Sequence, residues 1–261
     1  IVVPPKMECL IGRFFCRATE PAKTVYQLDD GSLIYWGTLK IDADGHPRAY
    51  HPDAGRGLDL LSHAGHPGNW WALATDDGKC GPTGTPIIQD ADDAAPGFYV
   101  TRTTMTNPSE ASCEKQSNYV NSGQIPFVAV SPFIRKYNFS RNSGNLFLVK
   151  NTQNGASEFA LFSDVAPSWG IGEGSMYLAE QLGYNPSPRD GGTDSRDNIF
   201  LMFTDEIRFP SNPDEILSAG WSAFRQWGGS QRLAICEQML RNKKSAAMNS
   251  LTVAACFCIQ P

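Results

Sequence analysis

Two pairs of alternating hydrophobic and polar runs are separated by turn signals. Residues 24–41 alternate on both sides of an Asp-Asp-Gly turn at 29–31, which predicts a β-hairpin. Residues 144–151 and 157–165 lie on either side of an Asn-Gly pair at 154–155 and predict a second hairpin. Shorter apolar or alternating runs predict further strands at 70–75, 97–105, 126–132 and 198–203.

The pattern changes to helical spacing directly after Glu173. Ser175 is a suitable N-cap, because its side-chain oxygen can accept a hydrogen bond from a free backbone N–H of the first turn. Met176, Leu178, Ala179 and Leu182 then follow at helical spacing, and Gly183 fits the stop. A short helix is therefore predicted after a glycine-rich link.

Residues 206–261 have a different pattern from the rest of the chain. Caps at Ser211 and Asn212, a proline in the first turn and helical spacing predict a helix that ends at Trp227, followed by a second helix over about 229–242. We predict a β-rich domain over 1–205 and a helical C-terminal extension over 206–261 packed on it.

Short strands, one long turn-rich connection and a small helix fit either a six-stranded β-barrel or a compact β-sandwich. We predict the barrel, which could be of the double-psi type, and hence a β-rich α+β fold. The 261 residues suffice for a sizeable core, and 24 glycines and 18 prolines agree with many turns.

The charge and hydropathy of the chain argue against nucleic acid and membrane as partners. The net charge is −5 and no run of Lys or Arg occurs, so we expect no nucleic-acid binding. No run of 18 apolar residues occurs, so we expect no membrane span.

Seven cysteines favour an oxidising compartment, and we expect a secreted or periplasmic protein. Buried free thiols in a cytosolic protein are the alternative. The pairings that the sequence leaves open include Cys9–Cys16, Cys80–Cys113, and Cys236 with Cys256 or Cys258.

Asp164 and Glu173 are the candidate catalytic residues. Asp164 ends a predicted strand and Glu173 precedes the predicted helix, so both side chains would project from rigid elements. Gly170, Gly172 and Gly174 permit close backbone approach and positive φ in the link between them. Paired carboxylates suit glycosidic bond cleavage, in which one is a protonated acid and the other an ionised base or nucleophile. We favour Glu173 as the acid and Asp164 as the base, although a helix dipole would favour the ionised form of Glu173.

The segments "FSDVAP", "GIGEGSMYLAEQLG", "SPRDGG" and "IFLMF" together resemble the fungal-type chitosanases of glycoside hydrolase family 75 and their bacterial relatives. The acidic loop that begins at "LKIDADGHPRAYH" and the run "IPFVAVSP" extend the resemblance to residues 35–205. It implies that Asp164 and Glu173 are the catalytic pair of an inverting enzyme that needs no metal or other cofactor.

The expected substrate is a β-1,4-linked amino-sugar polymer of the chitosan type, cleaved internally. Acidic side chains such as Asp59 would hold its ammonium groups, and aromatic rings such as Trp71 would stack on its sugars. The candidate substrate-binding residues are Asp42, Asp44, Tyr50, His51, Asp53, Trp70, Trp169, Ser175 and Arg189. At least one of the adjacent tryptophans 70 and 71 should pack in the core, because neighbouring strand residues face opposite ways.

The sequence is also compatible with functions other than chitosan cleavage. His46, His51, His63 and His66 lie close together among several aspartates, which is compatible with a metal site, but their spacing matches no metal signature. A peptidoglycan hydrolase could use the same carboxylate pair, as could an antibacterial toxin countered by an immunity protein. A carbohydrate-binding module without activity is the non-enzymatic alternative.

Overall fold

The computed structural model describes residues 11–15, 24–135, 144–166 and 170–249. In this part of the chain the strands are β1 (Ile11–Phe15), β2 (Val25–Leu28), β3 (Leu33–Asp42), β4 (Phe127–Ala129), β5 (Asn145–Asn151), β6 (Ser157–Asp164), β7 (Glu173–Ser175) and β8 (Thr193–Glu206). The α-helices are α1 (Pro132–Arg135), α2 (Met176–Gln181), α3 (Pro213–Trp227) and α4 (Gly229–Asn249).

Six strands close into a mixed β-barrel. Its order is β3-β7-β4-β6-β5-β8, and β8 also pairs with β3, which completes the ring. The β3–β7 and β4–β6 pairs are parallel and the other pairs of the ring are antiparallel. The predicted six-stranded barrel and β-rich α+β class are confirmed, and the double-psi arrangement stays a prediction. β1 and β2 continue the sheet outward from the start of β3.

Both faces of the barrel wall are buried. Along β5, Phe147 and Val149 point into the cluster inside the barrel, whereas Leu146 and Leu148 point outward into a second cluster. Side chains of α3 and α4 complete this outer cluster, among them Phe224 of α3. Because both faces of these strands are buried, their sequences are nearly continuous apolar runs.

The helical segment is fixed to the barrel by its packing and by polar contacts with the β2–β3 turn. Trp227, at the end of α3, donates its indole N–H to Ser32 Oγ at 3.0 Å. Arg232 of α4 lies 4.7 Å from the Trp227 ring centre and forms ion pairs with Asp29 at 2.7 Å and Asp30 at 2.6 Å. The predicted end of α3 is confirmed, and α4 continues past the predicted end at residue 242.

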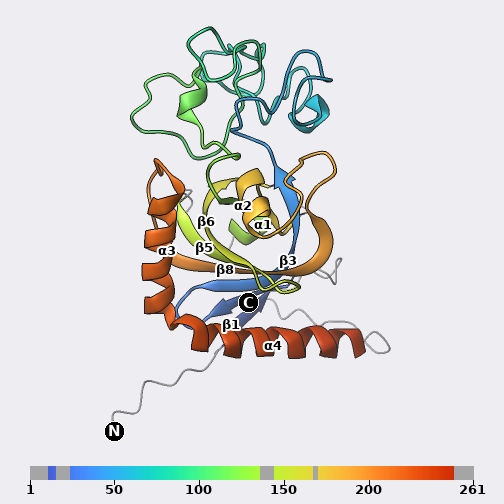
Figure 1. Cartoon of the computed structure of the whole chain (residues 1–261), viewed down its shortest axis with the longest axis vertical. Coiled ribbons are helices and arrows are strands. Elements are labelled where there is room, and N and C mark those ends of the chain that lie inside the picture. The colour runs from blue at the N-terminus through green and yellow to red at the C-terminus, as the bar shows by residue number, and fades with distance from the viewer. Residues whose placement is uncertain (1–10, 16–23, 136–143, 167–169, 250–261) are drawn as a thin grey trace.

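Residues 43–126 form one excursion between β3 and β4, which we call the cap; it lies over one end of the barrel (Figure 1). In the cap the regular elements are 3₁₀ turns at Leu61–His63 and Gln116–Asn118. The strands predicted at 70–75 and 97–105 are wrong: these segments pair through single-residue bridges such as Leu73 with Thr101.

The cap has small apolar clusters of its own and a disulfide between Cys80 and Cys113, one of the predicted pairings. Cys9, Cys16, Cys256 and Cys258, which the other predicted pairings need, lie outside the described residues. No helix in the described part of the chain is long and apolar enough to cross a membrane.

Candidate active site

The sheet register brings Asp164 and Glu173 to the same edge of the barrel. Ala129 of β4 is the register partner of Asp164 on one side and of Glu173 on the other. Neighbouring strands lie about 4.8 Å apart, so the two Cα atoms are about 10 Å apart. Asp42, the last residue of β3, is the register partner of Ser175, and one of its carboxyl oxygens lies within 4.8 Å of an oxygen of Asp164. The barrel itself therefore presents three carboxyl groups.

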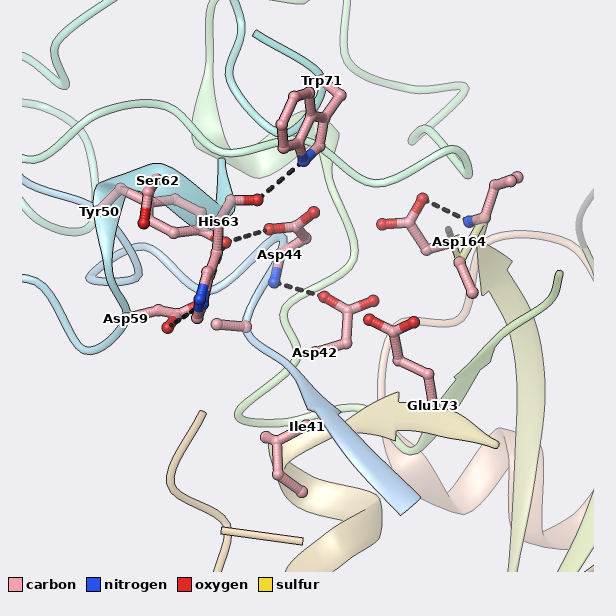
Figure 2. A pocket seen from close by; sticks show the side chains of 13 residues that line it. Ile41, Asp42, Asp44, Tyr50, Asp59, Ser62, His63, Trp71, Asp164 and Glu173 are labelled. Carbon is pink, nitrogen blue, oxygen red and sulfur yellow. Dashed lines mark hydrogen bonds and ion pairs between the residues drawn. The ribbon is translucent and has the colours of Figure 1, made fainter. Parts of the chain in front are cut away.

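These groups open into a pocket of about 650 Å³ between the barrel end and the cap (Figure 2). Five carboxyl groups line it, and none of the described lining residues is a Lys or an Arg. The polar and aromatic lining comprises Asp42, Asp44, Tyr50, Asp59, Ser62, His63, Trp71, Asp164 and Glu173. The pocket is thus strongly acidic and faces one exposed indole.

Asp164 is held by hydrogen bonds through one oxygen. Its Oδ1 accepts hydrogen bonds from the backbone N–H of Thr104 at 3.1 Å, from Thr104 Oγ1 at 2.8 Å and from the N–H of Val165 at 2.7 Å. Burial raises the pKa of Asp164 to about 6, while these hydrogen bonds act in the opposite direction. Its other oxygen points into the pocket (Figure 2).

Glu173 is positioned by backbone geometry. Gly172, at φ +101°, lets the chain pass so close to β3 that a Cβ there would lie 2.2 Å from Thr38 O. Thr38 Oγ1 also donates to Gly172 O at 3.1 Å. The predicted positive φ is confirmed at this glycine, and it places the next residue at the start of β7.

The electrostatic surroundings of Glu173 favour its protonated form. Burial, and next the charge of Asp164, raise the pKa of Glu173 to about 7, and Lys40 opposes this rise. Within the described residues, no side chain or backbone N–H donates to its carboxylate. Glu173 therefore keeps a proton near neutral pH more readily than Asp164 does.

Two more carboxyl groups complete the acidic wall. Asp42 Oδ1 accepts the N–H of Asp44 at 2.8 Å, and Asp44 Oδ1 accepts the phenol O–H of Tyr50 at 2.8 Å. Burial raises the pKa of both aspartates well above the usual value, and neighbouring carboxylates add to the rise. Oxygen atoms of Asp42, Asp44 and Asp164 lie within 4.8 Å of one another, a spacing at which a bound cation could neutralise them.

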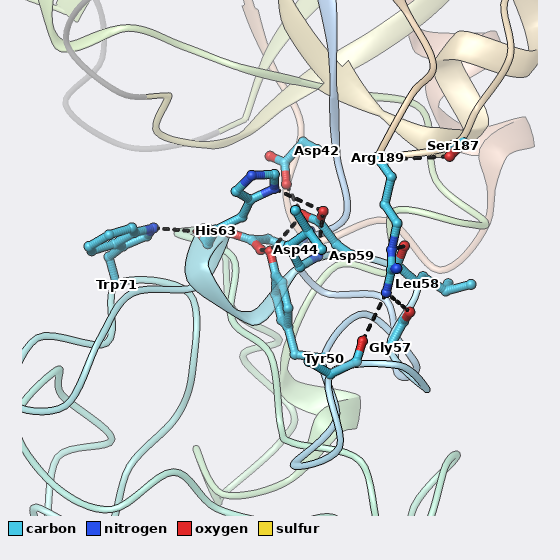
Figure 3. A network of polar contacts seen from close by, with 12 residues as sticks. Asp42, Asp44, Tyr50, Gly57, Leu58, Asp59, His63, Trp71, Ser187 and Arg189 are labelled. Carbon is cyan, nitrogen blue, oxygen red and sulfur yellow. Dashed lines mark hydrogen bonds and ion pairs between the residues drawn. The ribbon is translucent and has the colours of Figure 1, made fainter.

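A hydrogen-bonded network on the cap forms the opposite wall (Figure 3). His63 Nδ1 lies 2.9 Å from Asp59 Oδ1, and Asp59 Oδ2 lies 3.4 Å from the Tyr50 oxygen. The indole N–H of Trp71 donates to the backbone carbonyl of His63 at 2.8 Å, so the exposed ring is held in place. The four predicted residues Asp42, Asp44, Tyr50 and Asp59 therefore line the same pocket as Asp164 and Glu173.

Two of the remaining candidate residues, Trp70 and His51, are buried and do not line this pocket. Trp70 is only 8% exposed and packs in a core of the cap, whereas its neighbour Trp71 is 52% exposed and lines the pocket. His51 is also buried, with its ring edge-on against Phe98 and its Nδ1 accepting the N–H of Asp53 at 2.9 Å. Both Trp70 and His51 stabilise the cap rather than face the pocket.

Three further predicted residues have structural roles outside the pocket lining. Asp53 is exposed and accepts the N–H of Gly55 within its own loop. Ser175 is the N-cap of α2 and is fully buried, so its hydroxyl cannot meet a substrate. The Arg189 guanidinium donates to the carbonyls of Ala54, Gly57 and Leu58 and so secures the cap loop (Figure 3). Trp169 lies outside the described residues.

Sequence reasoning missed Thr104. It lies in the run "TRTTMT", where four threonines look alike and the alternation predicts a strand. The signal could not single it out, because its partner Asp164 is 60 residues away in the sequence.

The chain matches no family model, and no curated protein matches it. The resemblance to family 75 therefore stays a prediction, and the geometry of the pocket is what indicates a function.

Proposed function

We propose that this protein is an inverting glycoside hydrolase that cleaves β-1,4 linkages within an amino-sugar polymer of the chitosan type. One observation carries the proposal: Asp164 and Glu173, on two strands that flank β4, face one acidic pocket from positions that give them different surroundings. Unequal surroundings are what separates an acid from a base in a carboxyl pair.

The surroundings support one assignment of roles. Glu173, whose pKa is raised to about 7, gives its proton to the glycosidic oxygen as the bond to the anomeric carbon breaks. Asp164, which is stabilised as an anion by its hydrogen bonds, takes a proton from the water that attacks the opposite face of that carbon. Asp164 ends protonated and Glu173 ionised, and proton exchange with solvent restores both.

The charge of the pocket supports a cationic substrate. Five carboxyl groups without a described Lys or Arg among the lining residues would repel an anionic glycan and attract the ammonium groups of glucosamine. Asp44 and Asp42 lie beside the catalytic pair and can accept hydrogen bonds from such a group. Trp71 offers an indole face for a neighbouring sugar ring.

The disulfide supports a location in an oxidising compartment, and we propose that the protein is secreted or periplasmic. The acidic lining disfavours peptidoglycan, because the peptides attached to its muramic acid units carry carboxylates. An immunity protein is expected as a partner only if the protein is an antibacterial toxin that cleaves peptidoglycan.

Product analysis on chitosan, chitin oligomers and peptidoglycan tests the proposal. Asp164→Asn and Glu173→Gln should each lower the turnover of chitosan by about 10²–10⁴-fold, because each removes one half of the acid/base pair. The first product released should have the inverted anomeric configuration by proton NMR.

Asp53→Asn is the matched control, since this exposed carboxylate of the same acidic loop lies outside the pocket lining, and it should keep wild-type turnover. Activity retained in either catalytic variant would refute the pair. Cleavage of peptidoglycan alone would support the toxin reading, and binding of chitosan without products would support the inactive binding module.

A further inference from the structure

Thr104 is the one residue of the cap that bonds directly to a carboxyl group of the barrel's catalytic pair among the described residues. It reaches Asp164 twice, through its backbone N–H at 3.1 Å and through its hydroxyl at 2.8 Å. Both contacts go to Oδ1, the oxygen that also accepts the N–H of Val165 at 2.7 Å. Three donors therefore converge on one oxygen of the residue that we propose as the base.

This convergence distinguishes the two oxygens of Asp164. The two backbone N–H groups can only donate, so Oδ1 has to remain an acceptor and any proton must be carried by Oδ2. Oδ2 is also the oxygen that points into the pocket (Figure 2). Rotation of the carboxyl group would break all three hydrogen bonds, and the reactive oxygen is thereby kept facing the space where substrate and water would bind.

The cap segment that carries Thr104 is itself anchored on both sides. Met105 donates its N–H to Ser163 O at 2.8 Å, which joins the cap to the end of β6. Arg102 donates to Trp71 O at 3.1 Å and to Cys80 O, so the same segment is attached to the backbone of the pocket tryptophan and of a disulfide-bonded cysteine. Although Thr104 is exposed, its neighbours fix where its hydroxyl lies.

We propose that Thr104 is a positioning residue, which keeps Oδ1 of Asp164 as a permanent acceptor and leaves Oδ2 to take the proton from the attacking water. This inference rests on the proposed function for its catalytic meaning, but the hydrogen-bonded arrangement can be tested without any substrate. Four charged or titratable groups interact electrostatically with Asp164. They are Asp42, Asp44 and Glu173 in the pocket and Arg102 in the cap. None of them changes in the experiment.

The test compares Thr104→Val with Thr104→Ser in the full chain. Valine keeps the backbone donor and the shape but removes the hydroxyl, whereas serine keeps the hydroxyl. In Thr104→Val we expect kcat on chitosan to fall about tenfold with KM unchanged, because a hydrogen bond to a charged group is lost. The acidic limb of the kcat/KM profile should also move up by about one pH unit, and Thr104→Ser should restore both.

A second measurement separates this inference from the proposed function. Carbon-13 NMR of the aspartate carboxyl groups reports the titration of Asp164 directly, with Asp164→Asn identifying its signal. The Asp164 titration should move upward by about one pH unit in Thr104→Val and return in Thr104→Ser, even if no glycan is cleaved. A wild-type titration in Thr104→Val, or an equal shift in Thr104→Ser, would overturn the inference. A shifted titration with no cleavage by the wild type would overturn the proposed function alone.

Discussion

The barrel and the cap solve the problem of backbone hydrogen bonding in different ways. The barrel pairs its strands in continuous ladders, as between β5 and β8. The cap uses buried glutamines instead: Gln116 donates to Gly45 O and Thr101 O and accepts the N–H of Thr101, and Gln89 bridges Pro47, Tyr99 and Ala95 in the same way. One side chain thus replaces several ladder bonds.

This difference determines what each region supplies to the pocket. The barrel fixes Asp42, Asp164 and Glu173 through strand register, which tolerates little movement. The cap supplies the groups around them, such as Trp71 and Thr104, from irregular backbone. A rigid sheet can thus hold the carboxyl groups in place while a turn-rich segment adjusts their surroundings.

The largest effect is expected when the barrel alone is destabilised. Phe200 of β8 is fully buried and stacks on Tyr35 with ring centres 5.2 Å apart, so Phe200→Ala should lower the free energy of unfolding by about 3–5 kcal/mol. We expect the cap to unfold with the barrel in one urea transition followed by circular dichroism and by tryptophan fluorescence.

Ile88→Ala is the matched control in the cap. Its side chain is 50% exposed, and the free energy of unfolding should change by less than about 0.5 kcal/mol. A separate cap transition, unmoved by Phe200→Ala, would show that the cap folds independently of the barrel.

A smaller effect is expected when the cap alone is weakened. The disulfide between Cys80 and Cys113 spans 33 residues, and its removal by Cys80→Ala with Cys113→Ala should cost about 2–4 kcal/mol of cap stability. Limited proteolysis should then cut within 43–126 first and leave a barrel fragment, while activity falls with the cap.

Treatment of the wild type with a thiol reductant provides the comparison for this variant. The reduced wild type should be cut at the same cap sites, and the double variant should not respond further at these sites. Initial cleavage within the barrel strands would contradict the division into a stable barrel and a weaker cap.

The smallest expected effect concerns the acidic pocket where the two regions meet. The pKa of Asp164 rises from 3.8 to about 6 and that of Glu173 from 4.5 to about 7 on folding, and the pKa of Asp42 also rises. The folded state therefore binds protons more tightly than the unfolded chain, and these groups lower the stability as pH rises from about 4 to about 7.

Asp42→Asn removes one of these groups, so it should flatten the decline and raise the free energy of unfolding near neutral pH. Urea unfolding at a series of pH values measures this, and Asp53→Asn should reproduce the wild-type curve because Asp53 is exposed. Stability that stays constant or rises over the same window would contradict the buried acidic cluster.

The fold was predictable where the chain is organised by local chemistry. The Asn-Gly turn at 154–155 predicted a hairpin that the structure contains. The helix N-cap residue Asn212 likewise predicted the start of α3. The same reasoning failed at 97–105, where alternation reflects tertiary burial in the cap and not a strand ladder. It also underestimated β8 (Thr193–Glu206), because only its central apolar run at 198–203 carried a signal.

The site was predictable for the same physical reason. Asp164 and Glu173 could be recognised because strand ends and helix starts leave a local signature, and the structure places both in one pocket. Thr104 could not be recognised, because its role depends on a contact between distant segments. The choice between Trp70 and Trp71 likewise depended on how the cap packs.

The short strand β7 lies beside both ends of the cap. Asp42, where the cap begins, is the register partner of Ser175, and Phe127, where the cap ends, donates its N–H to Ser175 Oγ at 3.0 Å. The chain thus leaves and re-enters the barrel at neighbouring points. Evolution can lengthen, shorten or replace the 84 residues of the cap, 43–126, without breaking any strand pairing of the barrel. The same barrel can in this way acquire a differently lined pocket through one exchangeable insertion.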